Sequence, residues 1–505
     1  MKIRLINVTA LFVILSFTVF VFFSCADDIG DMANIEDDVI QHEQTDIYNE
    51  SDDTIESVRT VRSTPLPERD FGGYDFTFLV REFNDGGYWG AIDIYAEELT
   101  GDPINDAVFR RNRIVEDRYN ISISEVRVHD IFGTARRSIM ANSHDFDIIM
   151  PNLHDSSNFA AQGLLLDVRS QLPYLQLNEI WWDQRANDML SIANRQFILI
   201  GDMTLMANCA TWVVMFNKDV AADHHLGNLY DYVKEDNWNF DTFFNLVSQV
   251  SQDLDGNGIF DENDLLGLLT DSGARTILIY NTGEMVTRKD ENDLPFFSLN
   301  TERTIYAAQR AFEILSDRTI SINAHTDLPH ISDPWTNGVN LMFQENRGLF
   351  YMISLTVMHR MRGMYSDFGV LPSPKLDRYQ TEYFHTVQPS TTNSIIFPIT
   401  TPDLEMASII IEDMNFESRD TTRHAYFDIT VTNKMIRDEE SAEMLDLIFS
   451  TRIYDLGFIF NWGGMGYLLD TIFPDAGRFV SRFEAIEPRA VRELERTIEM
   501  FQNLD

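Results

Sequence analysis

Oxygen-bearing side chains recur at positions 1, 3, 5, 9 and 12 of the stretch DLDGNGIFDEND, which begins at residue 253. Position 6 is a glycine, as in calcium-binding loops of the EF-hand type, in which position 7 binds through its backbone carbonyl. Position 12 is Asp where Glu is usual, and the apolar run that follows predicts a strand in place of the usual second helix. We expect a structural calcium ion, and the alternative is an acidic turn without metal. The expected ligands are the side chains of Asp253, Asp255, Asn257, Asp261 and Asp264 and the carbonyl of Ile259.

A cysteine follows an apolar segment near the amino terminus. Two basic residues precede the mostly apolar run 11–23, whose 13 residues fit the apolar region of a secretory signal. The run ends in FFSC, which resembles a bacterial lipobox, so we expect removal of residues 1–24 and acylation of Cys25. The alternative is an uncleaved membrane anchor, because residues 5–26 carry no charge. Both alternatives place the rest of the chain outside the cell.

The compact catalytic motifs are missing from the sequence. It contains no HExxH, no GxSxG, no Walker loop and no GxGxxG after a predicted strand. The 80 Asp and Glu residues leave a glycosidase-type carboxylate pair open, but no pair stands out. The other cysteine, Cys209, stands in apolar surroundings, where we expect a small buried hydrophobe and no disulfide.

The composition restricts the possible partners. The chain has 505 residues, which favours about two to three domains, and 39 Lys and Arg against 80 Asp and Glu give a net charge of −41. Loss of residues 1–24 removes one Lys and one Arg, so the mature charge becomes −43. Such an acidic chain repels phosphate backbones, so we exclude nucleic acid as a partner.

Strands and helices must position any site in the body of the chain. Residues 25–72 are acidic, polar and without periodicity, which predicts a disordered tether. From residue 73 onward the apolar pattern switches repeatedly between the periods of strands and helices, which predicts an α/β fold with largely parallel sheets. The expected strands are 74–80, 121–128, 146–150, 197–205, 211–217, 265–269, 368–371 and 395–398. The expected helices are 106–119, 136–142, 157–164, 240–251, 301–315, 403–415 and 441–449.

Several phrases, taken in order, resemble the family 1 extracellular solute-binding proteins of bacterial ABC importers, the maltose-binding group. They are DIIMPNLHD at 147–155, FAAQGLLLD at 159–167, TWVVMFNKD at 211–219, FQENRGLF at 343–350 and FGVLPSP at 368–374. Leu349 and Phe350 depart from the family pattern, which has small residues after the glycine. The resemblance covers about residues 74–500.

The resemblance implies a fold and a function. It implies two interleaved α/β lobes joined by hinge segments, the type II periplasmic-binding-protein-like arrangement, with a ligand held between the lobes. The expected lobes are residues 73–205 plus 372–432 and residues 206–371 plus 433–505. The implied function is capture of a carbohydrate for an ABC importer, by a monomer that is lipid-anchored at the outer face of the bacterial membrane and meets the permease subunits there. No enzymatic activity is implied.

Sugars are held by aromatic rings that stack on their apolar faces and by polar groups that bond their hydroxyls. By position in the resemblance, the residues expected to contact the ligand are Trp89, Asn152, Asp155, Trp212, Arg275, Tyr351 and Trp462. Two other classes of protein remain open: a secreted, calcium-stabilised carbohydrate-active enzyme, and a surface glycan receptor without transport.

Overall fold

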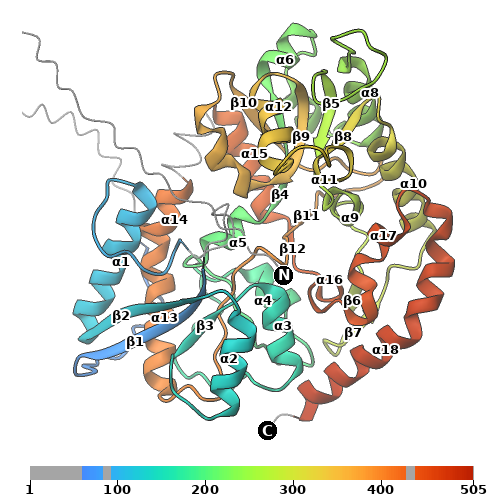
Figure 1. Ribbon diagram of the computed structural model, residues 1–505. Coiled ribbons are helices and arrows are strands. Elements are labelled where there is room, and N and C mark those ends of the chain that lie inside the picture. The colour runs from blue at the N-terminus through green and yellow to red at the C-terminus, as the bar shows by residue number, and fades with distance from the viewer. Residues whose placement is uncertain (1–59, 83–91, 428–437, 504–505) are drawn as a thin grey trace, which may run out of the picture. The chain divides into compact units, whose positions relative to one another are not determined.

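The computed structural model of the protein describes residues 60–82, 92–427 and 438–503 (Figure 1). The predicted signal segment, Cys25, most of the predicted tether and Trp89 lie outside the described residues. In the part of the chain that the structure describes, no helix is long and apolar enough to cross a membrane.

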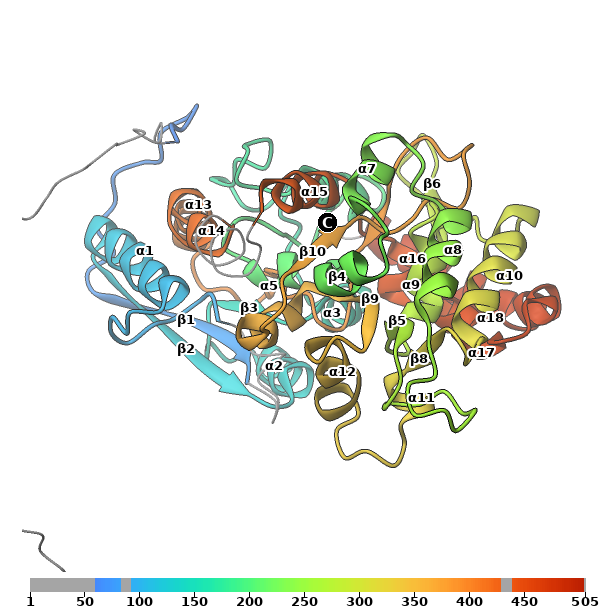
Figure 2. The ribbon, with the colours of Figure 1, turned by 90° about the horizontal axis from the view of Figure 1, so that it is seen from above.

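The first lobe is built on a parallel sheet of three strands in the order β2-β1-β3. Its strands are β1 (Tyr74–Arg81), β2 (Ile121–Val128) and β3 (Ile148–Met150). Helices α1 (Pro103–Tyr119) and α13 (Leu404–Asp420) cover one face, and α2 (Ile131–Met140) lies on the other (Figures 1 and 2). The alternation along β1 explains this arrangement, because Phe76 and Phe78 pack with α1 and α13 while Leu79 packs with α2.

The predicted tether ends earlier than the sequence indicated. Residues 60–72 are placed against the first lobe, where Arg62 pairs with Asp413 of α13 and lies 4.1 Å above the ring of Phe416. The backbone N–H of Phe71 donates to the carbonyl of Tyr119 at 2.9 Å. The acidic composition obscured this boundary, because the residues that anchor the segment, Arg62 and Phe71, stand singly in a polar stretch.

The second lobe is built on five strands in the order β10-β4-β9-β5-β8. They are β4 (Trp212–Asn217), β5 (Leu266–Thr270), β8 (Ser321–Asn323), β9 (Gly348–Ser354) and β10 (Phe368–Leu371). Strands β5, β8 and β9 are parallel, but β4 runs antiparallel to both β9 and β10. The expectation of a largely parallel sheet therefore fails at β4 alone, because β10 runs in the same direction as β5, β8 and β9. Burial on both faces makes β4 uniformly apolar, and such a strand carries no sequence signal of its direction.

Helix α8 (Phe240–Val250) shows how the second sheet is covered. The side chain of Asn239 caps its first turn, and Phe240, Phe243 and Val247 recur on its buried face. The helix lies so close to β5 that a Cβ added at Gly267 would stand 2.0 Å from the Val247 carbonyl oxygen. Glycine at this position is therefore required by the approach of the helix.

Short helices and two small sheets complete the fold. The helices before residue 300 are α3 (Leu153–Ala161), α4 (Gln184–Met189), α5 (Leu205–Cys209), α6 (Lys218–Asp223), α7 (Leu229–Lys234) and α9 (Ala274–Tyr280). The later ones are α10 (Glu302–Ser316), α11 (Ala324–Asp327), η1 (Trp335–Asn340), α12 (Leu341–Gln344), η2 (Leu355–Gly363), α14 (Thr422–His424) and α15 (Glu439–Ser450). The last segment carries α16 (Leu456–Phe460), η4 (Trp462–Tyr467), α17 (Leu468–Ile472), η5 (Ala476–Arg478) and α18 (Phe479–Asn503). The small sheets pair β6 (Thr287–Lys289) with β7 (Pro295–Phe297), and β11 (His385–Thr386) with β12 (Arg452–Ile453).

The chain crosses between the lobes near residues 204–212 and again near 388–395. Thr211 bridges to Val387, and farther on Leu199 bridges to Ile395 and Ile149 to Ile396. Residues 372–387 contact the second lobe: the carbonyl of Pro372 accepts from the indole N–H of Trp238, and Lys375 bridges to Asn239. The sequence analysis placed residues 372–387 in the first lobe, and this assignment is wrong. The Pro and polar residues around 372 mark the end of strand β10, whereas the chain crosses to the first lobe only near residue 388.

Two predicted strands do not form as such. Residues 197–205 and 395–398 make only isolated bridges, and α5 begins at Leu205. Phe197, Ile198 and Ile200 pack into one hydrophobic cluster while Leu199 packs into the other. The apolar run is therefore explained by burial between two cores, without a ladder of strand hydrogen bonds.

Candidate functional site

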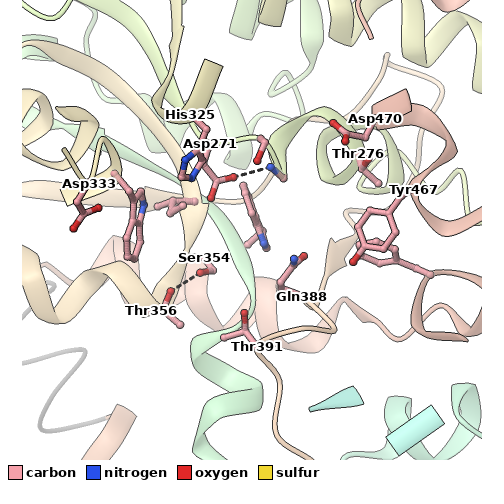
Figure 3. Close-up of a pocket in the computed structure, with 16 residues that line it drawn as sticks. Asp271, Thr276, His325, Asp333, Ser354, Thr356, Gln388, Thr391, Tyr467 and Asp470 are labelled. Atoms are coloured by element: carbon pink, nitrogen blue, oxygen red, sulfur yellow. Dashed lines mark hydrogen bonds between the residues drawn. The ribbon is translucent and has the colours of Figure 1, made fainter. Parts of the chain in front are cut away.

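A cavity of about 490 Å³ opens at one edge of the second sheet (Figure 3). Asp271 directly follows β5, His325 lies just after β8, and Ser354 ends β9. Because these three strands are parallel, their carboxyl ends meet at this edge, where open α/β sheets commonly bind ligands. Trp212 begins the antiparallel strand β4 opposite Ser354, and so it reaches the same edge. The crossing segment closes the cavity with Gln388 and Thr391.

Four aromatic rings line the cavity. Trp212 and Trp335 belong to β4 and η1, whereas Phe458 and Tyr467 come from the last segment of the chain. The Trp212 ring packs over Gly273, where an added Cβ would lie 2.7 Å from the nearest ring carbon. The absence of a side chain at Gly273 thus sets the position of the indole.

Three of the residues that line the cavity also carry a buried polar atom without a partner in the described chain. Trp212 Nε1, Thr276 Oγ1 and Gln388 Oε1 are buried and have no hydrogen-bond partner among the described residues. Trp212 and Thr276 are only 3% and 2% exposed. A buried polar atom without a partner costs about 1–3 kcal/mol. These atoms offer a donor, a hydroxyl and an acceptor, the set that a polyhydroxylated molecule satisfies.

The charged groups of the wall are mainly acidic. Asp271, Asp333 and Asp470 line the cavity together with the imidazole of His325 (Figure 3). Asp271 Oδ1 accepts from the backbone N–H of Gly273 at 2.7 Å. Burial raises the pKa of the Asp271 carboxyl above its ordinary value, although the Gly273 N–H and the nearby His325 and Arg275 lower it.

The residues predicted for the second lobe divide into those at the cavity and those in the core. Trp212 lines the cavity. Arg275 lies behind it: its guanidinium stacks 4.4 Å above the Phe473 ring, pairs with Asp470 at 3.4 Å and lines a separate cavity of about 230 Å³.

Tyr351 and Trp462 are buried away from the cavity. The Tyr351 hydroxyl donates to Asn340 Oδ1 at 2.8 Å, and the Tyr351 side chain is fully buried. Trp462 stacks on Phe460 at 4.7 Å, and its Nε1 donates to Thr497 Oγ1 of α18 at 2.9 Å. Both side chains are buried and hydrogen-bonded within the core, so neither contacts a ligand in this cavity.

The residues predicted for the first lobe gather at the start of α3. Asn152 caps this helix by accepting from the Asp155 N–H at 2.8 Å, and its amide donates to the Asp155 carboxylate at 3.0 Å. Burial raises the pKa of Asp155, while Arg81 opposes this shift. Neither residue lines the cavity, which receives none of its described wall from the first lobe.

His154 connects this helix to the cavity wall. Its Nδ1 lies 2.7 Å from the Ile459 carbonyl oxygen and its Nε2 lies 2.8 Å from the Tyr467 hydroxyl. A carbonyl only accepts, so Nδ1 carries the proton, and in the neutral ring Nε2 accepts from Tyr467. Burial lowers the pKa of His154, which favours this neutral form. The first lobe therefore orients a ring of the cavity without entering it.

The sequence analysis did not single out most of the lining residues. Those missed include Asp271, Thr276, His325, Gln388 and Tyr467. Asp271 carried a usable signal, because it is the first charged residue after the predicted strand 265–269. Gln388 and Tyr467 carried none, since they reach the cavity from segments far away in the sequence.

The acidic loop has part of the geometry that its spacing predicted. Ligand oxygens of Asp253, Asp255 and Asp264 lie within 4.8 Å of one another. Asp264 is fully buried, and its two oxygens accept from the backbone N–H groups of Leu254 and Asp261. The remaining expected ligands, Asn257, Ile259 and Asp261, lie on the same loop between these groups.

No protein-family model and no curated protein sequence matches the chain. Solved structures do match it. A sugar transporter of Rhizobium etli in an open conformation has a TM-score of 0.54 and 12% identity, over 86% of this chain and 100% of that one. The GacH receptor of Streptomyces glaucescens, solved with acarbose, has a TM-score of 0.51 and 11% identity, over 86% and 100%. UgpB of Mycobacterium tuberculosis, in complex with glycerophosphocholine, has a TM-score of 0.54 and 14% identity, over 85% and 99%.

These likenesses concern the fold. The chain has the two-lobed α/β fold of the maltose-binding type of ABC solute-binding protein, so the predicted fold class is confirmed. The matched proteins are binding proteins, and the alignment with this chain covers nearly the whole length of each of them.

Proposed function

We propose that this protein is an extracellular solute-binding protein that captures a carbohydrate for an ABC importer. The observation that carries the proposal is the cavity at the carboxyl edge of the second sheet, whose lining residues supply both aromatic rings and buried hydrogen-bonding atoms without partners among the described residues. Its volume of about 490 Å³ falls within the range of small-molecule pockets, about 300–1,000 Å³. The fold supports the same class, because the matched R. etli protein is a sugar transporter component and GacH binds acarbose.

The chemistry of the wall favours a sugar over other small solutes. Ring faces bury the C–H patches of a sugar, while Trp212 Nε1, Thr276 Oγ1 and Gln388 Oε1 are left for its hydroxyls. UgpB shows that this fold also hosts a phosphodiester ligand. The three carboxylates in the wall oppose the phosphate group of such a ligand.

A ligand screen by thermal shift and calorimetry tests this proposal. Mono- and oligosaccharides are compared with glycerophosphocholine, and we expect a sugar to raise the melting temperature. At a free concentration of 100 times Kd, mass action adds about 2.7 kcal/mol to the free energy of unfolding. Binding of glycerophosphocholine in preference to every sugar would contradict the carbohydrate assignment.

We propose a binding role rather than catalysis. The fold matches are binding proteins, and the sequence carries no compact catalytic motif. Incubation of the protein with the sugar that it binds should leave the sugar intact by chromatography. Cleavage at a rate above the no-protein control would instead favour the carbohydrate-active enzyme.

We further propose that the mature chain is a monomer that is anchored, through acylated Cys25, at the extracellular face of the cell membrane. There it meets the permease subunits. The lipobox-like FFSC stretch supports this. Cys25→Ala should yield an unprocessed, unacylated precursor by mass spectrometry. Recovery of the variant with the same acyl mass would contradict the anchor.

Permease genes beside this one would favour transport over a receptor role.

We also propose that the loop 253–264 binds calcium. The EF-hand-like spacing and the converging oxygens of Asp253, Asp255 and Asp264 support a structural ion. Calcium should raise the melting temperature and chelator should lower it, and the double change Asp253→Ala with Asp255→Ala should abolish the response. The exposed pair Asp241→Ala with Asp446→Ala serves as a control of equal charge change. A response that survives in the loop variant would place the metal elsewhere.

A further inference from the structure

The charge of the cavity wall is one-sided. Asp271, Asp333 and Asp470 line it, and no Lys or Arg is found among the described lining residues. Arg275 offsets Asp470 from the neighbouring cavity, at 3.4 Å. Asp333 is exposed at the rim. Asp271 forms no salt bridge with a Lys, Arg or His of the described chain, and its charge is offset only by the nearby His325 and Arg275 and by the Gly273 N–H.

A neutral ligand leaves this charge poorly satisfied. When a ligand excludes water, a carboxylate loses hydration, and hydroxyl donors replace it only in part. A cationic group on the ligand replaces the hydration with a charge-assisted hydrogen bond, which is roughly twice as strong as a neutral one. Burial raises the pKa of Asp271 by more than the Gly273 N–H, His325 and Arg275 lower it, which is the direction expected for a carboxylate without a directly bonded cation.

The aromatic rings of the same wall favour the same occupant. Trp212, Trp335, Phe458 and Tyr467 line the cavity with Asp271. An ammonium group is attracted to the face of such rings, most strongly to Trp. The unpartnered Trp212 Nε1 and Thr276 Oγ1, on residues 3% and 2% exposed, are independent signs that a polar ligand belongs in this space.

We propose that the ligand carries a protonated amino group, so that the cavity takes an amino sugar, with its ammonium against Asp271 and its hydroxyls on the unpartnered polar atoms. This inference rests on the proposed function and narrows its substrate class. It distinguishes a free amine from an N-acetyl group, because acetylation removes the charge and adds bulk.

Calorimetry with matched sugars tests the inference. Glucose, galactose and mannose are each compared with their 2-amino and 2-acetamido derivatives on the intact protein. We expect at least one hexosamine to bind about tenfold or more tightly than both of its neutral counterparts, the factor of a hydrogen bond to a charged group. Hexoses that bind as tightly as hexosamines would overturn the amino-sugar inference and leave the carbohydrate proposal standing. Failure of every sugar to bind, alongside binding of a non-sugar solute, would overturn both.

Variants at Asp271 assign the effect to that carboxylate. Asp271→Asn should weaken the hexosamine about tenfold or more and reduce its preference over the hexose, whereas Asp271→Glu should keep the preference. Asp446→Asn is the matched control, since Asp446 is exposed on α15 and is not a lining residue, and this change alters the net charge equally. Melting curves check that each variant is folded. Equal weakening of hexose and hexosamine by Asp271→Asn would overturn the inference.

Discussion

At the scale of single residues, Trp212 combines three properties that are rarely found together in a core tryptophan. It begins a central strand, its ring lies against a glycine, and its Nε1 has no partner among the described residues. Trp462 has the same residue type and similar burial, yet its Nε1 donates to Thr497. Residue type alone does not separate these cases, because the distinction depends on a partner in a distant helix. The sequence predicted both Trp212 and Trp462 as ligand contacts, and only the structure separates them.

Removal of the Trp212 ring should weaken sugar binding strongly. We expect Trp212→Ala to raise Kd about 30-fold or more, since aromatic hot spots contribute about 2–4 kcal/mol. Trp212→Phe keeps an apolar face but loses the Nε1 donor, so its effect should be smaller, about 1 kcal/mol. Calorimetry measures both. Tyr351→Phe is the control, because the Tyr351 hydroxyl bonds Asn340 in the core. An equal loss of affinity in Tyr351→Phe and Trp212→Ala would contradict the location of the site.

A methyl group at Gly273 should disturb the same ring. The added Cβ would lie 2.7 Å from Trp212, so Gly273→Ala must push the indole out of place. We expect a loss of about 1–3 kcal/mol in stability, as for overpacked cores, and a roughly tenfold rise in Kd. Gly363→Ala is the matched control, because no atom lies within 4 Å of its Cβ position. Unchanged sugar affinity in Gly273→Ala would show that the ring position is not needed.

At the scale of elements, local pattern predicted most strands and helices that have a periodic face. Strand β1 and helix α8 appear where alternation and the 3–4 spacing placed them. The pattern failed for residues 197–205, which are apolar because two cores meet around them. It also gave no direction for β4, whose neighbours are distant in sequence. The cavity depends on that direction, since it brings Trp212 to the same edge as Asp271.

His385 fixes three elements through one neutral ring. Its Nε2 accepts from the Ser373 N–H at 3.0 Å, and its Nδ1 lies 2.8 Å from Thr451 Oγ1, so β11 is held to the segments before it and after α15. Burial, followed by the charge of Arg185, lowers the pKa of His385 to about 3. A protonated ring could not accept from Ser373.

The sign of the pH dependence follows from this depressed pKa. Below the unfolded value of about 6.5, the unfolded chain binds a proton that the folded protein does not. The contribution of His385 is therefore complete above pH 6.5 and is lost as pH falls toward about 3, by up to about 1.4 kcal/mol per pH unit. We expect the melting temperature of His385→Gln to fall less steeply than that of the wild type between pH 6.5 and 4. The exposed His129→Gln should show the wild-type slope, and a wild-type slope in His385→Gln would contradict the argument.

At the scale of the whole molecule, the two lobes contact each other at several points, one of which includes a residue of the cavity wall. His154 of α3 meets Ile459 and Tyr467, and Asp293 of the turn between β6 and β7 accepts from the Asn194 N–H at 2.8 Å. Arg452 pairs with Asp183 at 2.6 Å across the same boundary. Such contacts bring together residues that are 99 to 313 positions apart in the chain. Local sequence patterns do not reveal such distant neighbours, so the lining of the site could not be predicted. The two-lobed fold was predictable by resemblance alone.

Loss of one such contact should weaken ligand binding indirectly. Tyr467→Phe removes the hydroxyl that donates to His154 but keeps a ring at the cavity wall. We expect a loss of about 1 kcal/mol in stability and a rise in Kd of up to about tenfold, because the ring is no longer oriented. Tyr379→Phe, on an exposed side chain, is the control. Calorimetry that finds Tyr467→Phe identical to the wild type in affinity would show that the first lobe does not influence the site.

The cavity is completed late along the chain. Phe458, Tyr467 and Asp470 supply one wall, and they stand in the final tenth of the sequence, after every strand of the two main sheets. The wall of the cavity is therefore complete only after residue 470 has been synthesised. In the proposed export, the amino-terminal end leaves the cytoplasm first, so sugars inside the cell meet only unfinished sites. The order of the wall along the chain thus restricts ligand capture to the compartment in which folding is completed.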